Sequence, residues 1–80
     1  MKTVHVRYYA VLREQRGASE EVVVTRAETP DALYRELKQS HGFTLPQNRV
    51  RAALNGEFAP QGAVLKEGDQ VAFLPPVAGG

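Results

Sequence analysis

Only one segment of this 80-residue sequence carries the signals of a long helix, and that limits the folds open to the chain. Thr29 offers a capping hydroxyl, Pro30 takes the first helical position, and Asp31 puts a carboxylate at the positive end of the helix dipole. These signals predict a helix from Pro30 to about Ser40 that stops at Gly42. One helix covers one face of one sheet, so the other segments are expected to supply strands.

The residues before this helix predict two strands and a short helical turn. Val4, Val6 and Tyr8 alternate with polar neighbours, which is the period of a strand buried on one face. Residues 10–16 contain no helix breaker and favour a short turn of helix. Residues 21–26 are rich in β-branched side chains and read as a second strand, antiparallel to the first.

The residues after the helix predict three more strands. Residues 43–49 are predicted to form a loop. In residues 50–54, Val50, Ala52 and Leu54 alternate with Arg51 and Ala53, which predicts a third strand. Asn55-Gly56 is a strong hairpin signal, and it leads into a short strand around residues 57–59.

The last strand is predicted from Gln70 to Leu74, and both Val64 and Leu65 are expected to reach the core before it. The order of elements is then β-β-α-β-β-β. With a central last strand, this order fits an α+β fold of the β-grasp (ubiquitin-like) type, in which one main helix crosses one face of a mixed sheet.

Composition excludes several classes of protein. The net charge of +1 comes from scattered lysines and arginines among nine carboxylates, which gives no reason to expect nucleic acid as a partner. The absence of cysteine excludes disulfides, thiolate metal sites and iron–sulfur clusters. No apolar run approaches the length of a signal peptide or a membrane span, so we expect a cytoplasmic protein that does not contact membranes.

The end of the sequence predicts a delivery tail, residues 75–80, on a globular domain of residues 1–74. Pro75 and Pro76 remove backbone donors, and Gly79-Gly80 can thread a narrow slot. Six extended residues reach about 20 Å. A frayed end is the alternative, but frayed ends are usually polar, and no charged side chain occurs after Asp69. The α-carboxylate of Gly80 is ionised at neutral pH and can attack a nucleotide phosphate to give an acyl-adenylate.

Three stretches resemble the small subunit of molybdopterin synthase. The end, Phe73-Leu74-Pro75-Pro76-Val77-Ala78-Gly79-Gly80, is similar to the C-terminal signature of that family. The start, Val6-Arg7-Tyr8-Tyr9-Ala10-Val11-Leu12-Arg13-Glu14, resembles its first strand and helical turn. The spacing of Asn55-Gly56 and Gly68-Asp69 is also similar. Leu74 and Ala78 depart from the family, which often has an aromatic residue and a small hydroxyl residue there.

The resemblance implies a sulfur carrier with no independent activity. In the family, the residue matched by Gly80 is adenylated by an ATP-dependent activating enzyme and converted to a thiocarboxylate. The tail then enters the large synthase subunit, where the sulfur passes to a pterin precursor in molybdenum cofactor biosynthesis. The assembled synthase of the family contains two copies of each subunit. The resemblance implies that a set of residues near the start and the end of the chain contacts the partner protein: Tyr9, Phe73, Leu74, Pro75, Pro76, Val77, Ala78 and Gly79.

The alternation of side chains along the strands also predicts an exposed surface. Tyr9 and Leu74 point away from the helix-covered face, whereas Phe73 has the core-facing parity. With Ala53 and Ala72, Tyr9 and Leu74 predict an exposed apolar patch, the usual mark of a protein interface.

Two other functions stay open at this point. One is a sulfur carrier for another pathway, such as thiazole synthesis, tRNA thiolation or amino-acid synthesis. The other is a ubiquitin-like binding or conjugation module that handles no sulfur and uses Gly80 for isopeptide linkage. No bound cofactor or metal is expected, because His5 and His41 have no carboxylate cluster beside them and no nucleophile–base pair or phosphate loop is present.

Overall fold

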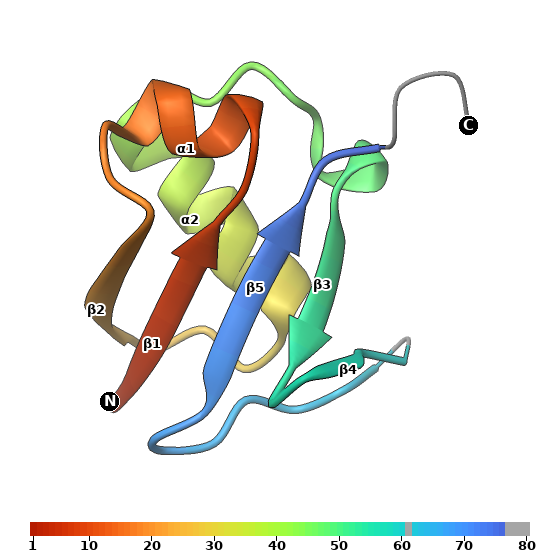
Figure 1. Ribbon diagram of the computed structural model, residues 1–80. Coiled ribbons are helices and arrows are strands. Elements are labelled where there is room, and N and C mark those ends of the chain that lie inside the picture. The colour runs from red at the N-terminus through yellow and green to blue at the C-terminus, as the bar shows by residue number, and fades with distance from the viewer. Residues whose placement is uncertain (61, 77–80) are drawn as a thin grey trace.

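The computed structural model describes residues 1–60 and 62–76, which form one mixed sheet with a helix across one face (Figure 1). The elements are β1 (Lys2–Tyr8), α1 (Val11–Arg16), β2 (Glu20–Thr25), α2 (Pro30–His41), the 3₁₀ turn η1 (Gln47–Arg49), β3 (Arg51–Leu54), β4 (Glu57–Phe58) and β5 (Gln70–Leu74). The five strands lie in the order β2-β1-β5-β3-β4. β1 and β5 are parallel, and the other neighbours are antiparallel. The β-grasp arrangement predicted from the sequence is confirmed.

Both ends of α2 are fixed by the predicted residues. The Thr29 hydroxyl accepts a hydrogen bond from the Ala32 N–H at 3.1 Å, and Pro30 occupies the first turn. At the other end, Gly42 takes the left-handed conformation, and its N–H donates to the Lys38 carbonyl at 2.8 Å. These caps satisfy backbone groups that a helix end otherwise leaves unpaired. Local signals alone therefore place the helix that covers the sheet.

The core lies between α2 and the sheet. Val4, Val6 and Tyr8 from β1 and Val71 and Phe73 from β5 are each at most 1% exposed. From α2 and the segment after it, they are met by Leu33, Tyr34, Leu37 and Phe43. The strand periodicity read from the sequence therefore identifies the buried face correctly.

The loop before β5 differs from the prediction at Val64. Leu65 is buried, with only 2% of its surface exposed, but Val64 is 60% exposed. The Leu65 N–H donates to the Glu28 carbonyl at 2.9 Å, which holds this residue against the chain that leads into α2. Neighbouring side chains in an extended segment point in opposite directions, so only one of the two faces the core. The expectation that Val64 also reaches the core is wrong.

The Asn55-Gly56 turn joins β3 to β4 as predicted. Both residues have positive φ, 51° and 91°, as a tight hairpin turn of this kind requires. The Asn55 N–H donates to the Gln70 carbonyl at 2.8 Å, and the Asn55 side-chain oxygen accepts from the Gln70 N–H at 3.0 Å. The turn is thereby attached to the start of β5.

No helix in the described part of the chain has the length and apolar character needed to cross a membrane.

Replacing Leu33 with alanine tests the packing of α2 on the sheet. Leu33 is fully buried, so Leu33→Ala is expected to lower the free energy of unfolding by about 2–5 kcal/mol, measured by urea unfolding. Arg35→Ala, on the exposed side of the same helix, is the control and should change it by about 0.5 kcal/mol or less. Equal effects of the two substitutions would show that α2 does not carry the core.

Candidate partner-binding surface

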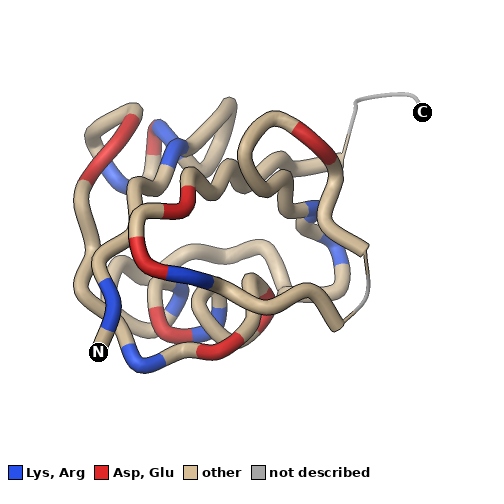
Figure 2. The backbone as a smooth tube through the Cα atoms, turned by 90° about the horizontal axis from the view of Figure 1, so that it is seen from below, with Lys and Arg blue, Asp and Glu red and all other residues tan. Residues whose placement is uncertain are grey.

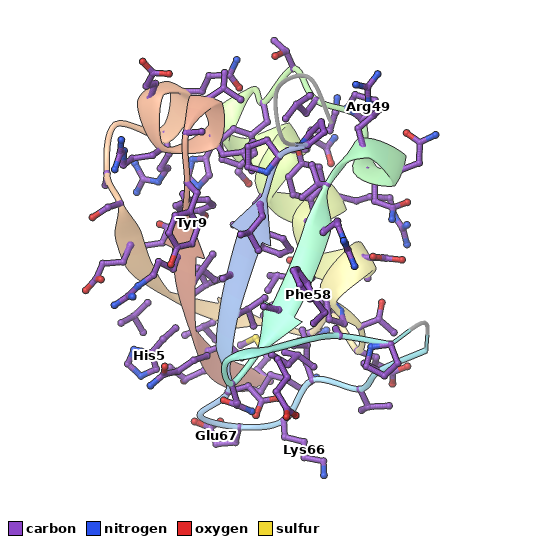
Figure 3. All side chains as sticks on the ribbon, turned by 45° about the vertical axis from the view of Figure 1, so that its right-hand side comes forward. His5, Tyr9, Arg49, Phe58, Lys66 and Glu67 are labelled. Carbon is purple, nitrogen blue, oxygen red and sulfur yellow. The ribbon has the colours of Figure 1, made fainter. Side chains whose placement is uncertain are left out.

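The face of the sheet opposite α2 carries an apolar surface that crosses four strands. The strand register aligns Arg7, Ala72, Ala53 and Phe58 in one row. Tyr9 directly follows β1, and Leu74 ends β5. In Figure 3, Tyr9 and Phe58 lie on either side of β5. We call Tyr9, Ala53, Phe58, Ala72 and Leu74 the open-face patch.

The open-face patch is accessible and slightly hollowed. Phe58 is 60% exposed and Tyr9 is 38% exposed, which is unusual for large apolar side chains. All five residues line a depression of about 710 Å³. The predicted grouping of Tyr9, Leu74, Ala72 and Ala53 on this face is therefore confirmed. Phe58 was missed, because its place depends on the pairing of the two-residue strand β4 with Ala53.

Arginines border the open-face patch. The Arg51 guanidinium lies over the Phe58 ring, 4.1 Å from its centroid, in a cation–π contact. Arg7 contacts Glu20 at 3.4 Å, and both side chains are more than 60% exposed. Elsewhere in the described residues, acidic and basic positions are interspersed along the backbone, and neither sign dominates one side (Figure 2). The open-face patch is thus an apolar area with charged borders.

The predicted tail begins beside this patch. β5 ends at Leu74, Pro75 is half-buried and Pro76 is exposed. Val77, Ala78, Gly79 and Gly80, all predicted as functional residues, lie outside the residues that the structure describes.

Phe73 needs a correction. It was grouped with the partner-binding residues, but its side chain is 1% exposed and packs edge-on against Tyr34 in the core, with ring centroids 5.3 Å apart. Phe73 has the same parity as Val71, so it faces α2. Its side chain supports the strand that carries Leu74 and offers no surface to a partner.

A cluster of four polar side chains was not found from the sequence. The Glu21 carboxylate of β2 accepts hydrogen bonds from Arg16 of α1 at 2.9 Å and from the Tyr8 hydroxyl of β1. His41, at the end of α2, contacts the same carboxylate at 3.0 Å. Four elements therefore meet at one carboxylate on the helix-covered side. A glutamate directly before three valines gives no sequence signal for such contacts.

These contacts shift the two acids of the cluster in opposite directions. Burial alone raises the pKa of the Glu21 carboxyl, but the hydrogen bonds from Arg16, Tyr8 and His41 outweigh it and lower the pKa to about 2. Burial, together with the neighbouring Glu21 carboxylate, raises the pKa of the Tyr8 hydroxyl. The cluster therefore holds Glu21 ionised and Tyr8 neutral at physiological pH. Such an arrangement ties elements together and contains no reactive nucleophile.

The histidines and acids of the described residues form no group of three or more that could hold a metal ion. His5 is exposed on β1, opposite Val22 of β2 and Gln70 of β5 in the register. The His41 side chain contacts the Glu21 carboxylate.

One main helix over a mixed sheet, with the last strand ending beside an open apolar face, defines a domain of the ubiquitin-like β-grasp class. Residues 6–80 match the ThiS family, so the chain belongs to this family. It is 37% identical, with all of both chains covered, to the molybdopterin synthase sulfur carrier subunit of Mycobacterium tuberculosis. The predicted resemblance is confirmed.

Solved structures agree with this assignment. The putative molybdopterin converting factor, subunit 1, from Pyrococcus furiosus is similar with a TM-score of 0.78 and 29% identity, over 96% of this chain and 100% of that one. A chain in the complex of subunits 1 and 2 of the molybdopterin-converting factor from Helicobacter pylori is similar with a TM-score of 0.66 and 25% identity. There, 98% of this chain and 99% of that one are covered.

The low pKa of Glu21 predicts a pH-dependent contribution to stability. The native-state pKa of about 2 lies below the ordinary value of 4.5, so the contribution is complete above about pH 4.5 and is lost as the pH falls through 2. We expect Glu21→Gln to be less stable than wild type at pH 7, with the difference shrinking between pH 4.5 and 2. Urea unfolding at several pH values measures this, and Glu14→Gln, an exposed carboxylate on α1, is the control. A difference that stays constant with pH would contradict the assignment.

Proposed function

We propose that this chain is the sulfur carrier subunit of a molybdopterin synthase. The observation that carries the proposal is the match, over its whole length, to the Mycobacterium tuberculosis subunit of that name. Gly79 and Gly80 have no side chains, which suits a segment that must enter a narrow slot in a partner. The alternative functions considered from the sequence gain no specific support from the geometry.

The chemistry takes place at the terminal carboxylate of Gly80. An oxygen of this carboxylate attacks the α-phosphate of ATP on an activating enzyme, and pyrophosphate leaves. A sulfur nucleophile then displaces AMP from the acyl-adenylate, which leaves a thiocarboxylate on Gly80. This thiocarboxylate is a soft nucleophile whose sulfur forms a bond to a carbon of a pterin precursor in the large subunit, where positive groups stabilise the developing charge. Water then cleaves the bond between that sulfur and the carbonyl carbon of Gly80, which leaves the sulfur on the pterin and restores the Gly80 carboxylate.

The described residues supply the docking part of this mechanism. The open-face patch lies at the root of the tail, so a large subunit that covers the patch is placed to receive residues 75–80. Burial of Tyr9 and Leu74 excludes water at the entrance and adds affinity. The similar Helicobacter pylori chain occurs in a complex of subunits 1 and 2, which supports a docked carrier of this kind.

Loss of the terminal glycine tests the reaction. The protein is incubated with an activating enzyme, ATP and a sulfur donor, and fragment-ion mass spectrometry locates any added sulfur. Wild type is expected to carry sulfur on Gly80 and to support molybdopterin formation with a large subunit, whereas a chain lacking Gly80 should do neither. Full synthase activity of the shortened chain would refute the proposal.

Leu74→Asp tests the docking surface. A carboxylate at the root of the tail is expected to weaken binding to the large subunit at least about tenfold, measured by isothermal titration calorimetry, because it must be desolvated in an apolar contact. Val64→Asp places the same charge on an exposed valine outside the open-face patch and serves as the matched control. Equal affinities of the two variants would remove the patch from the interface.

A further inference from the structure

The outer edge of β2 is exposed and apolar, and nothing in the proposed function uses it. β2 ends the sheet on one side with six residues, whereas the opposite edge strand, β4, has only two (Figure 1). Val22 and Val24 of β2 are 61% and 59% exposed. An edge of this length is a template for another strand unless the sequence blocks it.

The hydrogen-bonding direction along β2 follows from its pairing with β1. The Tyr8 N–H donates to the Ser19 carbonyl at 2.8 Å, one step beyond the last registered pair, Arg7 with Glu20. Hydrogen-bonded and non-hydrogen-bonded pairs alternate in an antiparallel ladder, so Glu21 and the other odd-numbered residues of β2 direct their backbone groups to β1. The even-numbered residues, Glu20, Val22 and Val24, direct theirs outward.

We propose that this edge pairs with the same edge of a second copy of the chain. The two β2 strands run antiparallel, and Val23 lies opposite Val23 of the second copy on a two-fold axis. Val22 then faces Val24 of the second copy, and Glu20 faces its Arg26, the residue that directly follows β2. Residues with outward backbone groups meet each other in this register, so the ladder continues across both chains.

The charges favour this register over its neighbours. A shift of the pairing by two residues keeps the outward backbone groups matched but places Glu20 opposite Val24, or Val22 opposite Arg26. Only the proposed register joins each carboxylate to a guanidinium and each outward valine to another valine, and opposite-charge and β-branched cross-strand pairs are stabilising. Glu20 is available for this contact because its pairing with Arg7 is long and exposed.

The pairing leaves the five residues of the open-face patch free, and only Glu20, Glu21 and Val22 of β2 line the same depression. β1 separates β2 from β5, so Leu74 and the start of the tail lie away from the joined edges. A single strand pair buries little surface, so the dimer is expected to be weak and to depend on concentration. Two copies therefore form one continuous sheet with the open-face patch of each still accessible.

Sedimentation equilibrium of the full chain, up to about 1 mM, measures the association. Arg26→Glu alone places two carboxylates opposite each other, and Glu20→Arg alone places two cations opposite each other, so each variant should associate at least about tenfold more weakly than wild type. An equimolar mixture of the two variants restores opposite charges at both positions. The mixture is expected to form a heterodimer with an affinity near that of wild type.

Two further variants separate edge pairing from general effects. Val24→Pro removes an outward N–H, which an edge strand tolerates, and should abolish dimer formation while the circular dichroism spectrum of the monomer is kept. Arg35→Glu, exposed on α2, gives the same change in net charge as Arg26→Glu and should leave association unchanged. A wild-type chain that stays monomeric, or a mixture that associates no better than its components, would overturn the proposal. None of these measurements requires a synthase.

Discussion

The parallel pairing of β1 with β5 is the constraint on which the rest of the structure depends. Parallel neighbours cannot be joined by a tight turn, so the chain between them must travel out of the sheet and back. That excursion supplies α1, β2, α2, β3 and β4. β2 then pairs with β1, β3 pairs with β5, and β4 extends the sheet beyond β3. The first and last strands of the chain therefore lie side by side in the middle of the sheet.

This central pair also separates the core from the binding surface. Every second residue of β1 and β5 faces α2, and the residues between them face the open side of the sheet. Val71 and Phe73 are buried by this rule, while Ala72 and Leu74 reach the open-face patch. A strand that fills the core thus ends beside the surface proposed for docking, so core packing fixes where Leu74 lies.

Local signals were sufficient for most of the fold. Strand alternation, the Thr29-Pro30 helix start and the Asn55-Gly56 turn each act over a few residues, so a single sequence reveals them. The prediction that Val64 is buried was wrong because an irregular segment has no fixed period. One long-range hydrogen bond, from the Leu65 N–H, decides which side chain turns inward.

Residues of the candidate site could be predicted only where the alternation of side chains along a regular strand determines which face each one points to. Tyr9 and Leu74 were placed correctly because each extends a regular strand. Phe58 was missed because its orientation depends on the hairpin pairing, and the burial of Phe73 limits it to a supporting role. The Glu21 cluster joins residues that are far apart in the sequence, 13 positions for Tyr8 and 20 for His41, so no local pattern indicates it.

Glu20 and Glu21 show how one strand separates two tasks. They are neighbours in β2, so their side chains point to opposite faces. Glu21 turns toward the helices, where Arg16, Tyr8 and His41 surround its carboxylate and attach β2 to α1, β1 and α2. That attachment on the covered side fixes which backbone groups of β2 point outward. Because the outward row is fixed in this way, Glu20 and the exposed valines can define a single register for a strand arriving from outside.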